Sequence, residues 1–203
     1  MILDVPYNFH WIEQGEAARS AQAYVGFLGP FLRAHGLRAL VNLRGRNPDH
    51  SWWRYETRTC DQAGVVHIDA KLNSRQLPTA AMVADLLNAF DSSPRPFLIK
   101  CSGGQDRTSL AAGLYLLHCH GAQAFTLAER QFAPWPYLHW PKRRQRWLKL
   151  FLYFFRERSS DRPLRNWIEK HYSAQEFRCW LEARGEGRSF HGLYGAPGSA
   201  IGG

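Results

Sequence analysis

The chain of 203 residues holds only four cysteines and no long run of apolar residues. The cysteines lack paired spacing, so a small disulfide-rich scaffold is excluded. No stretch reaches ~18 apolar residues without a charge, which excludes a transmembrane helix. The first residues, MILDVPYNFHWIEQGE, have no basic segment and no long apolar core, so they are not expected to form a secretory signal. A reducing, cytoplasmic setting is therefore expected.

Acidic residues are also few. The 17 Asp and Glu stand against 26 Lys and Arg, which gives a formal net charge of +9. Residues 142–203 carry 13 basic and 6 acidic residues, whereas residues 1–141 carry 13 and 11. The sequence therefore predicts an anionic partner near the C-terminal part. Nucleic acid would suit the charge, but no nucleic-acid-binding motif is present, so that partner is not expected.

What is present is ordinary globular composition, with 45% hydrophobic residues, and this excludes a mostly disordered chain. Short apolar runs and helical spacing alternate over the first 120 residues. The expected strands cover residues 37–43, 65–72 and 96–100, and the expected helices cover residues 21–35, 78 onward and 107–120. Residues 45–55 are expected to form a loop. This alternation predicts an α/β domain with a central sheet.

The remaining pattern is helical. Helices are expected over residues 123–133 and 142–158, and Ser173 with Glu176 has the spacing of a capping box for a last helix. From residue 185 the chain has seven Gly in 19 residues and is expected to be mobile. The predicted units are a core, a helical extension packed on it and a Gly-rich mobile tail, over residues 1–135, 136–184 and 185–203.

Residues 100–108, Lys-Cys-Ser-Gly-Gly-Gln-Asp-Arg-Thr, lie between an expected strand and an expected helix. We call this segment the Cys101 loop. Gly103 and Gly104 allow successive backbone N–H groups to curl around one tetrahedral anion. The positive end of the following helix adds to this, and Arg107 can fold back to hold two phosphate oxygens. The loop is therefore predicted to bind a phosphate group.

Cys101 would lie at the bottom of this cup. The same N–H groups, the helix end and Arg107 would lower the pKa of its thiol and hold it as a thiolate. A thiolate that faces a bound phosphate is a nucleophile aimed at phosphorus. Thr108 can donate a hydrogen bond to the sulfur and help it leave.

The Cys101 loop resembles the signature loop of the protein tyrosine / dual-specificity phosphatase superfamily. Its Asp-Arg-Thr ending is similar to phosphoinositide phosphatases, myotubularins and bacterial members with broad or lipid substrates. Shorter motifs resemble the bacterial and atypical dual-specificity group: Asn8-Phe9, Arg19-Ser20-Ala21-Gln22 and Asn42-Leu43-Arg44-Gly45. The resemblance covers residues 8–133. It implies a central, mostly parallel sheet flanked by helices, here with an α-helical C-terminal extension.

The resemblance also implies roles for individual residues. Cys101 would be the nucleophile that forms a phosphocysteine, and Arg107 would bind the phosphate. Ser102, Gly103, Gly104, Gln105 and Thr108 would line the phosphate site, and no metal or cofactor would be needed. Two positions depart from the family pattern. Ser109 replaces the usual Gly, and Gln105 stands where a Lys is common, so one positive charge over the phosphate is missing.

The general acid has two candidates. Many family members supply an Asp from a loop about thirty residues before the Cys, and Asp69 has that distance but falls inside an expected strand. Myotubularin-like enzymes use the Asp before the loop Arg, which is Asp106 here. We favour Asp106. The alternative for Asp69 is a strand-end carboxylate bonded to the neighbouring backbone.

Three other features have competing interpretations. Arg44 could bind phosphate or could be a buried structural Arg paired with a carboxylate. Cys60 could form a regulatory disulfide with Cys101, as backdoor cysteines do in some relatives, and the alternative for Cys101 is a buried structural cysteine before a helix. The run from His118 to His120 is not expected to bind metal, because consecutive helical residues point in different directions.

The extension combines aromatic and basic residues. Trp140 and Trp147 accompany the basic residues Lys142, Arg143, Arg144, Arg146 and Lys149. This combination predicts either an element that sits on an anionic membrane surface and presents a lipid phosphate to the loop, or a helix packed on the core with a solvated basic first turn.

Two functions from different classes follow. The first is a cysteine-dependent phosphatase that hydrolyses phosphate monoesters, in a phosphoprotein or in a phosphoinositide or other lipid, and that is cytoplasmic or peripheral on the inner membrane face. The second is a catalytically weak phosphate-binding or membrane-associated module.

Overall fold

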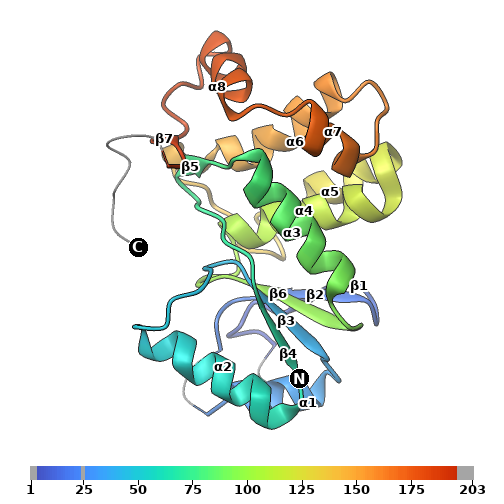
Figure 1. The fold of residues 1–203 in the computed structure, drawn as a ribbon, viewed down its shortest axis with the longest axis vertical. Helices are drawn as coiled ribbons and strands as arrows, with labels where there is room; N and C mark the ends of the chain where they lie inside the picture. Colours follow the sequence, from blue (N-terminus) through green and yellow to red (C-terminus); the bar gives the residue numbers. More distant parts are fainter. Residues whose placement is uncertain (1–3, 24–25, 196–203) are drawn as a thin grey trace.

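The computed structural model describes residues 4–23 and 26–195, and its centre is a five-stranded sheet (Figure 1). The strand order is β1-β2-β6-β3-β4. The four strands from β2 to β4 run parallel, and only β1 is antiparallel to its neighbour. In that order the strands are His10–Glu13, Ala17–Ser20, Phe97–Lys100, Ala39–Asn42 and Val66–Asp69. The predicted α/β class with a mostly parallel sheet is confirmed.

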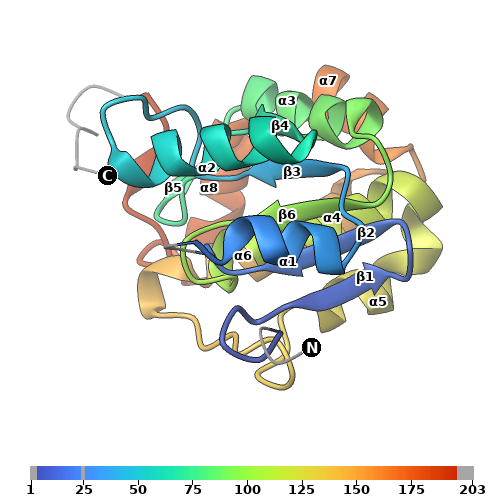
Figure 2. The same cartoon turned by 90° about the horizontal axis from the view of Figure 1, so that it is seen from below.

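Helices cover both faces of this sheet (Figure 2). One face carries α1 (Leu28–Ala34) and α2 (Ser51–Ala63), and the other carries α3 (Ala80–Ser92) and α4 (Asp106–His120). The buried apolar residues accordingly form two clusters, a smaller one under α1 and α2 and a larger one on the side of α3 and α4. The carboxyl ends of the parallel strands meet at one edge, where Lys100 ends β6 in the middle of the sheet.

The predicted strands at residues 37–43, 65–72 and 96–100 correspond to β3, β4 and β6. Two differences have physical causes. The expected loop at residues 45–55 is wrong from Ser51 onward, because α2 begins there, and its first turn holds two tryptophans that contact partners outside the helix. Strands β1 and β2 were not predicted, because the buried strand Ala17–Ser20 contains an Arg and a Ser rather than an apolar run.

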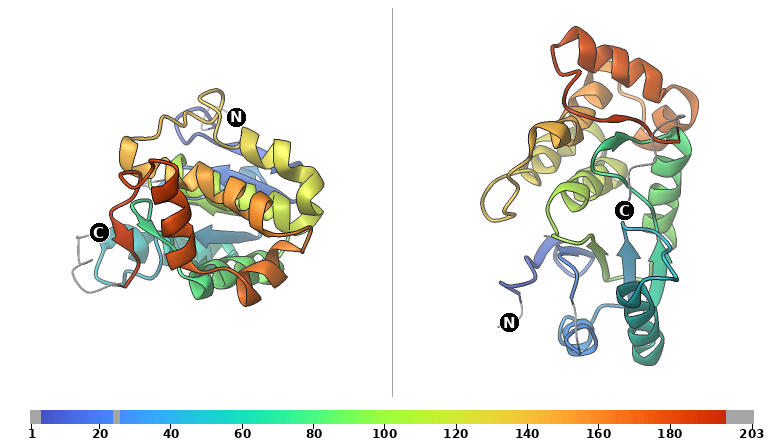
Figure 3. Two further views of the ribbon diagram at one scale, coloured as in Figure 1. Left: turned by 90° about the horizontal axis from the view of Figure 1, so that it is seen from above. Right: turned by 90° about the vertical axis from the view of Figure 1, so that its left-hand side faces the viewer.

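The C-terminal helices extend the larger apolar cluster (Figure 3). They are α5 (Phe125–Arg130), α6 (Trp147–Arg158), α7 (Leu164–Lys170) and α8 (Ala174–Ala183). Helix α6 packs against α4 and α5 on one side and against α8 on another. This placement explains why residues 150–155 are apolar nearly all round. Rings from several helices meet edge to face, as Phe151 does with Trp167 and with Phe177.

The last described residues return to the body of the protein. Gly192–Leu193 (β7) pairs in parallel with Gln76–Leu77 (β5), and the Phe190 side chain beside it is buried. This part of the expected mobile tail is thus held by strand pairing, and residues 196–203 lie outside the described residues. Among the described residues, no helix has the length and apolar character needed to cross a membrane.

Candidate functional site

The Cys101 loop connects β6 to α4 at the carboxyl edge of the sheet, as the sequence predicted. Cys101 follows the central strand directly and is almost completely buried, with 3% of its surface exposed. Ser102 and Gly103 are exposed, and α4 begins at Asp106. Arg107 folds back over the loop, where its NH2 group donates to Ser102 Oγ at 3.1 Å. The loop thus forms a short cup with a sulfur at its base and a guanidinium at its rim.

The surroundings of Cys101 favour the thiolate. Burial alone would raise the pKa of the thiol. The positive charge of Arg107 and hydrogen bonds from the Thr108 hydroxyl and from the backbone N–H groups of Thr108 and Gly104 outweigh burial, so the pKa is lower than usual. The Thr108 hydroxyl is buried and has no other partner among the described residues, so it is available to the sulfur.

Gly104 sets how closely the loop approaches the neighbouring strand. Its φ is +64°, a left-handed conformation that glycine adopts freely. A Cβ at this position would lie 2.5 Å from the backbone N of Ala21 and 2.7 Å from the carbonyl carbon of Ser20. Only a residue without a side chain allows the loop to sit against the end of β2 in this way.

Arg19 supports the loop from below. It is fully buried, and its NH2 group donates to the Gly104 carbonyl at 3.0 Å and to Ser109 Oγ at 2.9 Å. Its NH1 group donates to the backbone and side-chain oxygens of Gln131. Burial lowers the pKa of Arg19 to about 10, while the negative charges that Tyr137 and Cys101 acquire when ionised act in the opposite direction. Arg19 therefore adds positive charge beneath the loop and fixes its backbone.

Asn8 provides a second support. Its side-chain amide donates to the Gly104 carbonyl at 3.2 Å and to the Tyr137 carbonyl at 2.9 Å. Asn8 and Arg19 lie in the short motifs that carried the resemblance, but neither was predicted as a site residue. Their partners lie far away in the sequence, so only the motifs themselves pointed to them.

Asp106 lies in the first turn of α4, next to Arg107. One carboxylate oxygen accepts a hydrogen bond from Gln145 Nε2 at 2.7 Å, and the other lies 3.5 Å from His139 Nε2. His139 is buried, and its Nε2 has no hydrogen-bond partner among the described residues. Residues of the extension thus contact a candidate catalytic carboxylate directly.

Asp69 lies at the end of β4, on the same edge of the sheet. Its carboxylate accepts from Asn42 Nδ2 at 2.7 Å and from Trp53 Nε1 at 3.0 Å. In the strand register, Asn42 pairs with Asp69 on one side and with Lys100 on the other, which places Asp69 two strands away from Lys100. Asp69 is thus a carboxylate at a strand end, but its partners are side chains and not the neighbouring backbone of the alternative interpretation.

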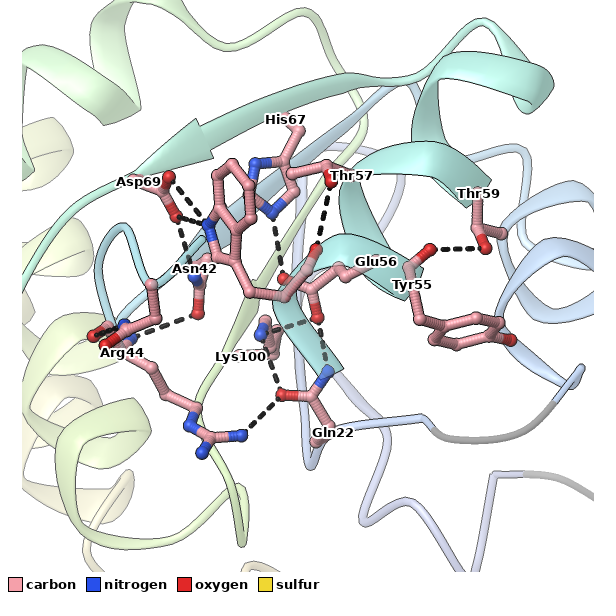
Figure 4. Close-up of polar contacts among 12 residues, drawn as sticks. Gln22, Asn42, Arg44, Tyr55, Glu56, Thr57, Thr59, His67, Asp69 and Lys100 are labelled. Carbon is pink, nitrogen blue, oxygen red and sulfur yellow. Dashed lines mark hydrogen bonds and ion pairs between the residues drawn. The ribbon is translucent and has the colours of Figure 1, made fainter. Parts of the chain in front are cut away.

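A buried polar network lies beside the loop (Figure 4). Lys100 Nζ is 2.6 Å from Glu56 Oε2 and donates to Gln22 Oε1 at 2.9 Å, and His67 Nε2 is 2.9 Å from Glu56 Oε1. Burial lowers the pKa of Lys100 to about 8 despite the Glu56 carboxylate. The backbone N–H of Gln22 donates to the Ser102 carbonyl at 3.1 Å, so the network is attached to the loop.

Arg44 borders this network without a carboxylate partner among the described residues, so the predicted pairing with an acid is wrong. Its NH1 group donates to Gln22 Oε1 at 3.1 Å, and its guanidinium lies 3.5 Å from the centre of the Trp52 ring. Cys60 lies on α2 and is buried in the apolar cluster on the other face of the sheet from the cluster that includes Cys101. Burial raises the pKa of Cys60 to about 12, which does not favour disulfide chemistry.

The basic residues of the extension divide into two groups. Lys142, Arg143, Arg144 and Arg146 are exposed, and Arg143–Gln145 form one short helical turn. We call residues 142–146 the basic segment. Trp147 and Lys149 do not belong to this surface: Trp147 is buried and donates to the Ser74 carbonyl, and Lys149 pairs with Glu129 at 3.0 Å.

No model of a protein family matches the chain, and no curated protein matches it. Solved structures do. TpbA from P. aeruginosa is 15% identical with a TM-score of 0.55, over 87% of this chain and 92% of that one. PTPMT1 is 13% identical with a TM-score of 0.54, over 75% and 98%. The catalytic domain of the PP-IP phosphatase SIW14 from S. cerevisiae is 17% identical with a TM-score of 0.51, over 88% and 93%. At these identities the likeness shows a shared fold.

Proposed function

We propose that this chain, which has the fold of the atypical tyrosine and dual-specificity phosphatases, is a cysteine-dependent phosphatase that hydrolyses phosphate monoesters. The observation that carries the proposal is the state of Cys101. A buried thiol with a lowered pKa, at the base of a loop that ends in a folded-back Arg107 and a helix N-terminus, is an activated nucleophile in an anion site. An inert structural cysteine would have a raised pKa, as Cys60 has.

The reaction has two steps. In the first, the Cys101 sulfur forms a bond to phosphorus, the bond from phosphorus to the ester oxygen breaks, and the leaving oxygen takes a proton from Asp106. In the second, water attacks the phosphocysteine, its proton goes to the Asp106 carboxylate, and the S–P bond breaks. Arg107 and the backbone N–H groups of Ser102, Gly103, Gly104 and Gln105 hold the phosphate oxygens, and Thr108 stabilises the departing thiolate.

Asp106 is the better proposal for the acid because it lies on the loop itself. Asp69 has its carboxylate engaged by Asn42 and Trp53 and lies two strands away from Lys100. The similar structures support phosphorylated substrates of different kinds, since TpbA has been solved with pTyr and SIW14 is a PP-IP phosphatase. A phosphotyrosine protein and a phosphoinositide or other lipid phosphate are both within the proposal.

Hydrolysis of an activated aryl phosphate by the purified chain tests the proposal. Cys101→Ser should reduce the rate by at least about a thousandfold and still bind vanadate, because Arg107 and the backbone cup are intact. Arg107→Lys should reduce it by about a hundredfold or more, since a point charge cannot replace a bidentate fork. A wild-type chain that binds vanadate but does not hydrolyse the aryl phosphate would instead be the phosphate-binding module.

A membrane-facing mode of action is a second candidate, and one surface favours it. Trp135 and Trp140 are 81% and 71% exposed and lie close in sequence to the basic segment. Gln145 in that segment bonds to Asp106, so this surface borders the loop. Aromatic and basic side chains together suit the interface of an anionic lipid bilayer. We propose that the segment from 135 to 146 presents a lipid phosphate to Cys101.

Vesicle sedimentation tests this mode. The chain should bind anionic vesicles more tightly than neutral ones, and binding should weaken with salt. The variant Arg143→Gln, Arg144→Gln, Arg146→Gln should bind less. A matched control removes the same charge elsewhere, at the exposed Arg33 on α1, Arg38 before β3 and Arg58 on α2. Equal binding to both vesicle types, or equal loss in both variants, would leave a water-soluble phosphate ester as the substrate.

A further inference from the structure

Arg44 is held in place from two directions. Its guanidinium lies over the Trp52 ring at 3.5 Å, and one N–H of NH1 donates to Gln22 Oε1 at 3.1 Å. Its backbone is fixed as well, because the Arg44 N–H donates to Asn42 Oδ1 at 3.0 Å. A guanidinium carries five N–H donors, and those that do not bond to Gln22 have no partner among the described residues. The side chain is half-exposed, so these donors are open to solvent.

The position of Arg44 places these donors beside the Cys101 loop. Arg44 follows β3, which neighbours β6, and the Leu43 N–H donates to the Lys100 carbonyl at 2.9 Å. Gln22 accepts from Arg44 with its side chain and donates to the Ser102 carbonyl with its backbone. Ser102 in turn accepts from Arg107. One residue therefore separates Arg44 from the loop, on the side of Ser102.

Among the residues that the structure describes, no carboxylate pairs with Arg44. Glu56, the buried carboxylate of the network, is occupied by Lys100 at 2.6 Å and by His67 at 2.9 Å (Figure 4). Lys100 itself lies 5.1 Å from the centre of the Trp52 ring, so two cations flank that ring. Arg19 and Arg107 add two more positive charges around the loop.

We propose that Arg44, held by Trp52 and Gln22, is a second anion subsite that binds a phosphate of the substrate other than the one attacked by Cys101. The proposal rests on the proposed phosphatase function and narrows its substrates to molecules with two phosphates. Arg suits this role because its planar fork can donate two parallel hydrogen bonds to one phosphate while its face stays on an aromatic ring. The ligand chemistry is a bisphosphate, either a free ester or a lipid headgroup.

A series of non-hydrolysable phosphonates tests the subsite, as competitive inhibitors of aryl phosphate hydrolysis in the presence of a chelator. The series is methylphosphonate and the methylene, ethylene and propylene bisphosphonates. A bisphosphonate has two equivalent phosphonate groups, and either can enter the Cys101 loop. This statistical factor alone lowers its inhibition constant about twofold. Bonds from Arg44 to a second phosphonate should improve it by about tenfold or more for at least one spacer length in the wild-type chain.

Substitutions of Arg44 test whether its side chain causes the preference for a bisphosphonate. In Arg44→Gln, the ratio of the inhibition constant of methylphosphonate to that of the best bisphosphonate should fall to about two. In Arg44→Lys, this ratio should lie between that value and the wild-type ratio. Arg46→Gln is the matched control, because Arg46 is an exposed Arg two residues away, and it should keep the wild-type ratio. If Arg44→Gln does not fold, as judged by circular dichroism, Arg44→Lys decides the question. A ratio near two in the wild-type chain, or an unchanged ratio in Arg44→Gln, overturns the subsite.

Failure of the subsite and failure of the proposed function give different results. If the wild-type chain hydrolyses no aryl phosphate, the function itself is wrong. If it hydrolyses aryl phosphate but shows no bisphosphonate preference, only the subsite is wrong. Phosphate release from a free inositol bisphosphate and from vesicles carrying the same headgroup separates the two sources. Faster release by the wild-type chain than by Arg44→Gln on either source supports the subsite and identifies the source, and equal release on both overturns it.

Discussion

Gly104 shows how much the loop depends on a single residue. It combines a left-handed backbone with contact against the end of β2, and two buried side chains, Arg19 and Asn8, bond to its carbonyl. Gly103, the preceding residue, has neither constraint, since no atom lies within 4 Å of the place where its Cβ would be. Two adjacent glycines with the same role in the sequence pattern therefore differ in the structure.

Gly104→Ala should lower the free energy of unfolding by about 1–3 kcal/mol and should reduce aryl phosphate hydrolysis at least about tenfold. A Cβ cannot fit 2.5 Å from a backbone nitrogen, so the loop must move away from β2. Urea denaturation and steady-state kinetics measure the two effects. Gly103→Ala is the control for stability and should leave the urea midpoint nearly unchanged. Equal destabilisation by both substitutions would contradict the prediction.

The two candidate acids, Asp106 and Asp69, can be distinguished by how the hydrolysis rate of each variant depends on the leaving group. Asp106→Asn should slow hydrolysis of alkyl phosphates by about a hundredfold, because a basic leaving oxygen needs a proton. It should spare nitrophenyl phosphate, whose leaving group is a weak base. Asp69→Asn should change neither rate much, since Asp69 is bonded to Asn42 and Trp53. The reverse pattern would transfer the role to Asp69.

At the scale of elements, the first turn of α4 and the chain leading into α6 meet at Asp106. Gln145 lies at the end of the turn Arg143–Gln145 and bonds to one carboxylate oxygen, and His139 approaches the other. Helix α6 is fixed by burial of Trp147, whose Nε1 donates to the Ser74 carbonyl. The extension thus holds Gln145 against α4, and it acts as a positioning element for the proposed acid.

Gln145→Leu should reduce kcat for alkyl phosphates by about tenfold, while kcat for nitrophenyl phosphate changes little, because the carboxyl group is no longer oriented. The acidic and basic limbs of the pH–rate profile for alkyl phosphates should shift as well, which a purely structural loss would not produce. Arg143→Gln, in the same turn, is the control. Loss of both activities in equal proportion would mean that Gln145 only stabilises the fold.

At the scale of the whole molecule, Glu56 connects elements from different parts of the chain. It lies on α2, and its partners come from β4, from β6 and from the segment after β2. Burial would raise the pKa of Glu56, but His67 and Lys100 outweigh it and hold the pKa below its usual value. The carboxylate is therefore favoured in the folded chain, and it neutralises Lys100, the residue next to Cys101.

The sign of the pH dependence follows from that lowered pKa. A depressed carboxyl pKa stabilises the fold above the ordinary value near 4.5, and this stability is lost as the pH falls through the folded value. Glu56→Gln should be less stable than the wild-type chain by about 3–5 kcal/mol at pH 7, because Lys100 stays buried without its partner. The difference should shrink below pH ~4.5. Urea denaturation at several pH values tests this, and a constant difference down to pH ~3 would contradict it.

The sequence by itself determined the local features on which the proposed chemistry of the loop depends. Cys101, the two glycines, Arg107 and Thr108 act through backbone N–H groups, a helix end and a folded-back side chain, all within nine consecutive residues. Such local features are encoded by the order of the residues. The same holds for β3 and β6, whose short apolar runs predict buried strands. The N-cap of α8 forms as well, since the Glu176 N–H donates to Ser173 Oγ, although the reciprocal bond of the predicted capping box is absent among the described residues.

Only the tertiary structure decided what surrounds the loop. Strand β2 buries an Arg whose partners lie 85 to 112 residues away, and Asn8 bonds to a carbonyl 129 residues away. Separate segments also meet where Gln145 bonds to Asp106 and where the Arg44 guanidinium stacks on the Trp52 ring. From the sequence alone, a polar side chain can be expected either on the surface in water or buried against a hydrogen-bond partner. Which of these two arrangements has the lower free energy depends on how remote elements pack around it. That packing places the Asp106 carboxylate beside Gln145 and the open guanidinium of Arg44 beside the Cys101 loop.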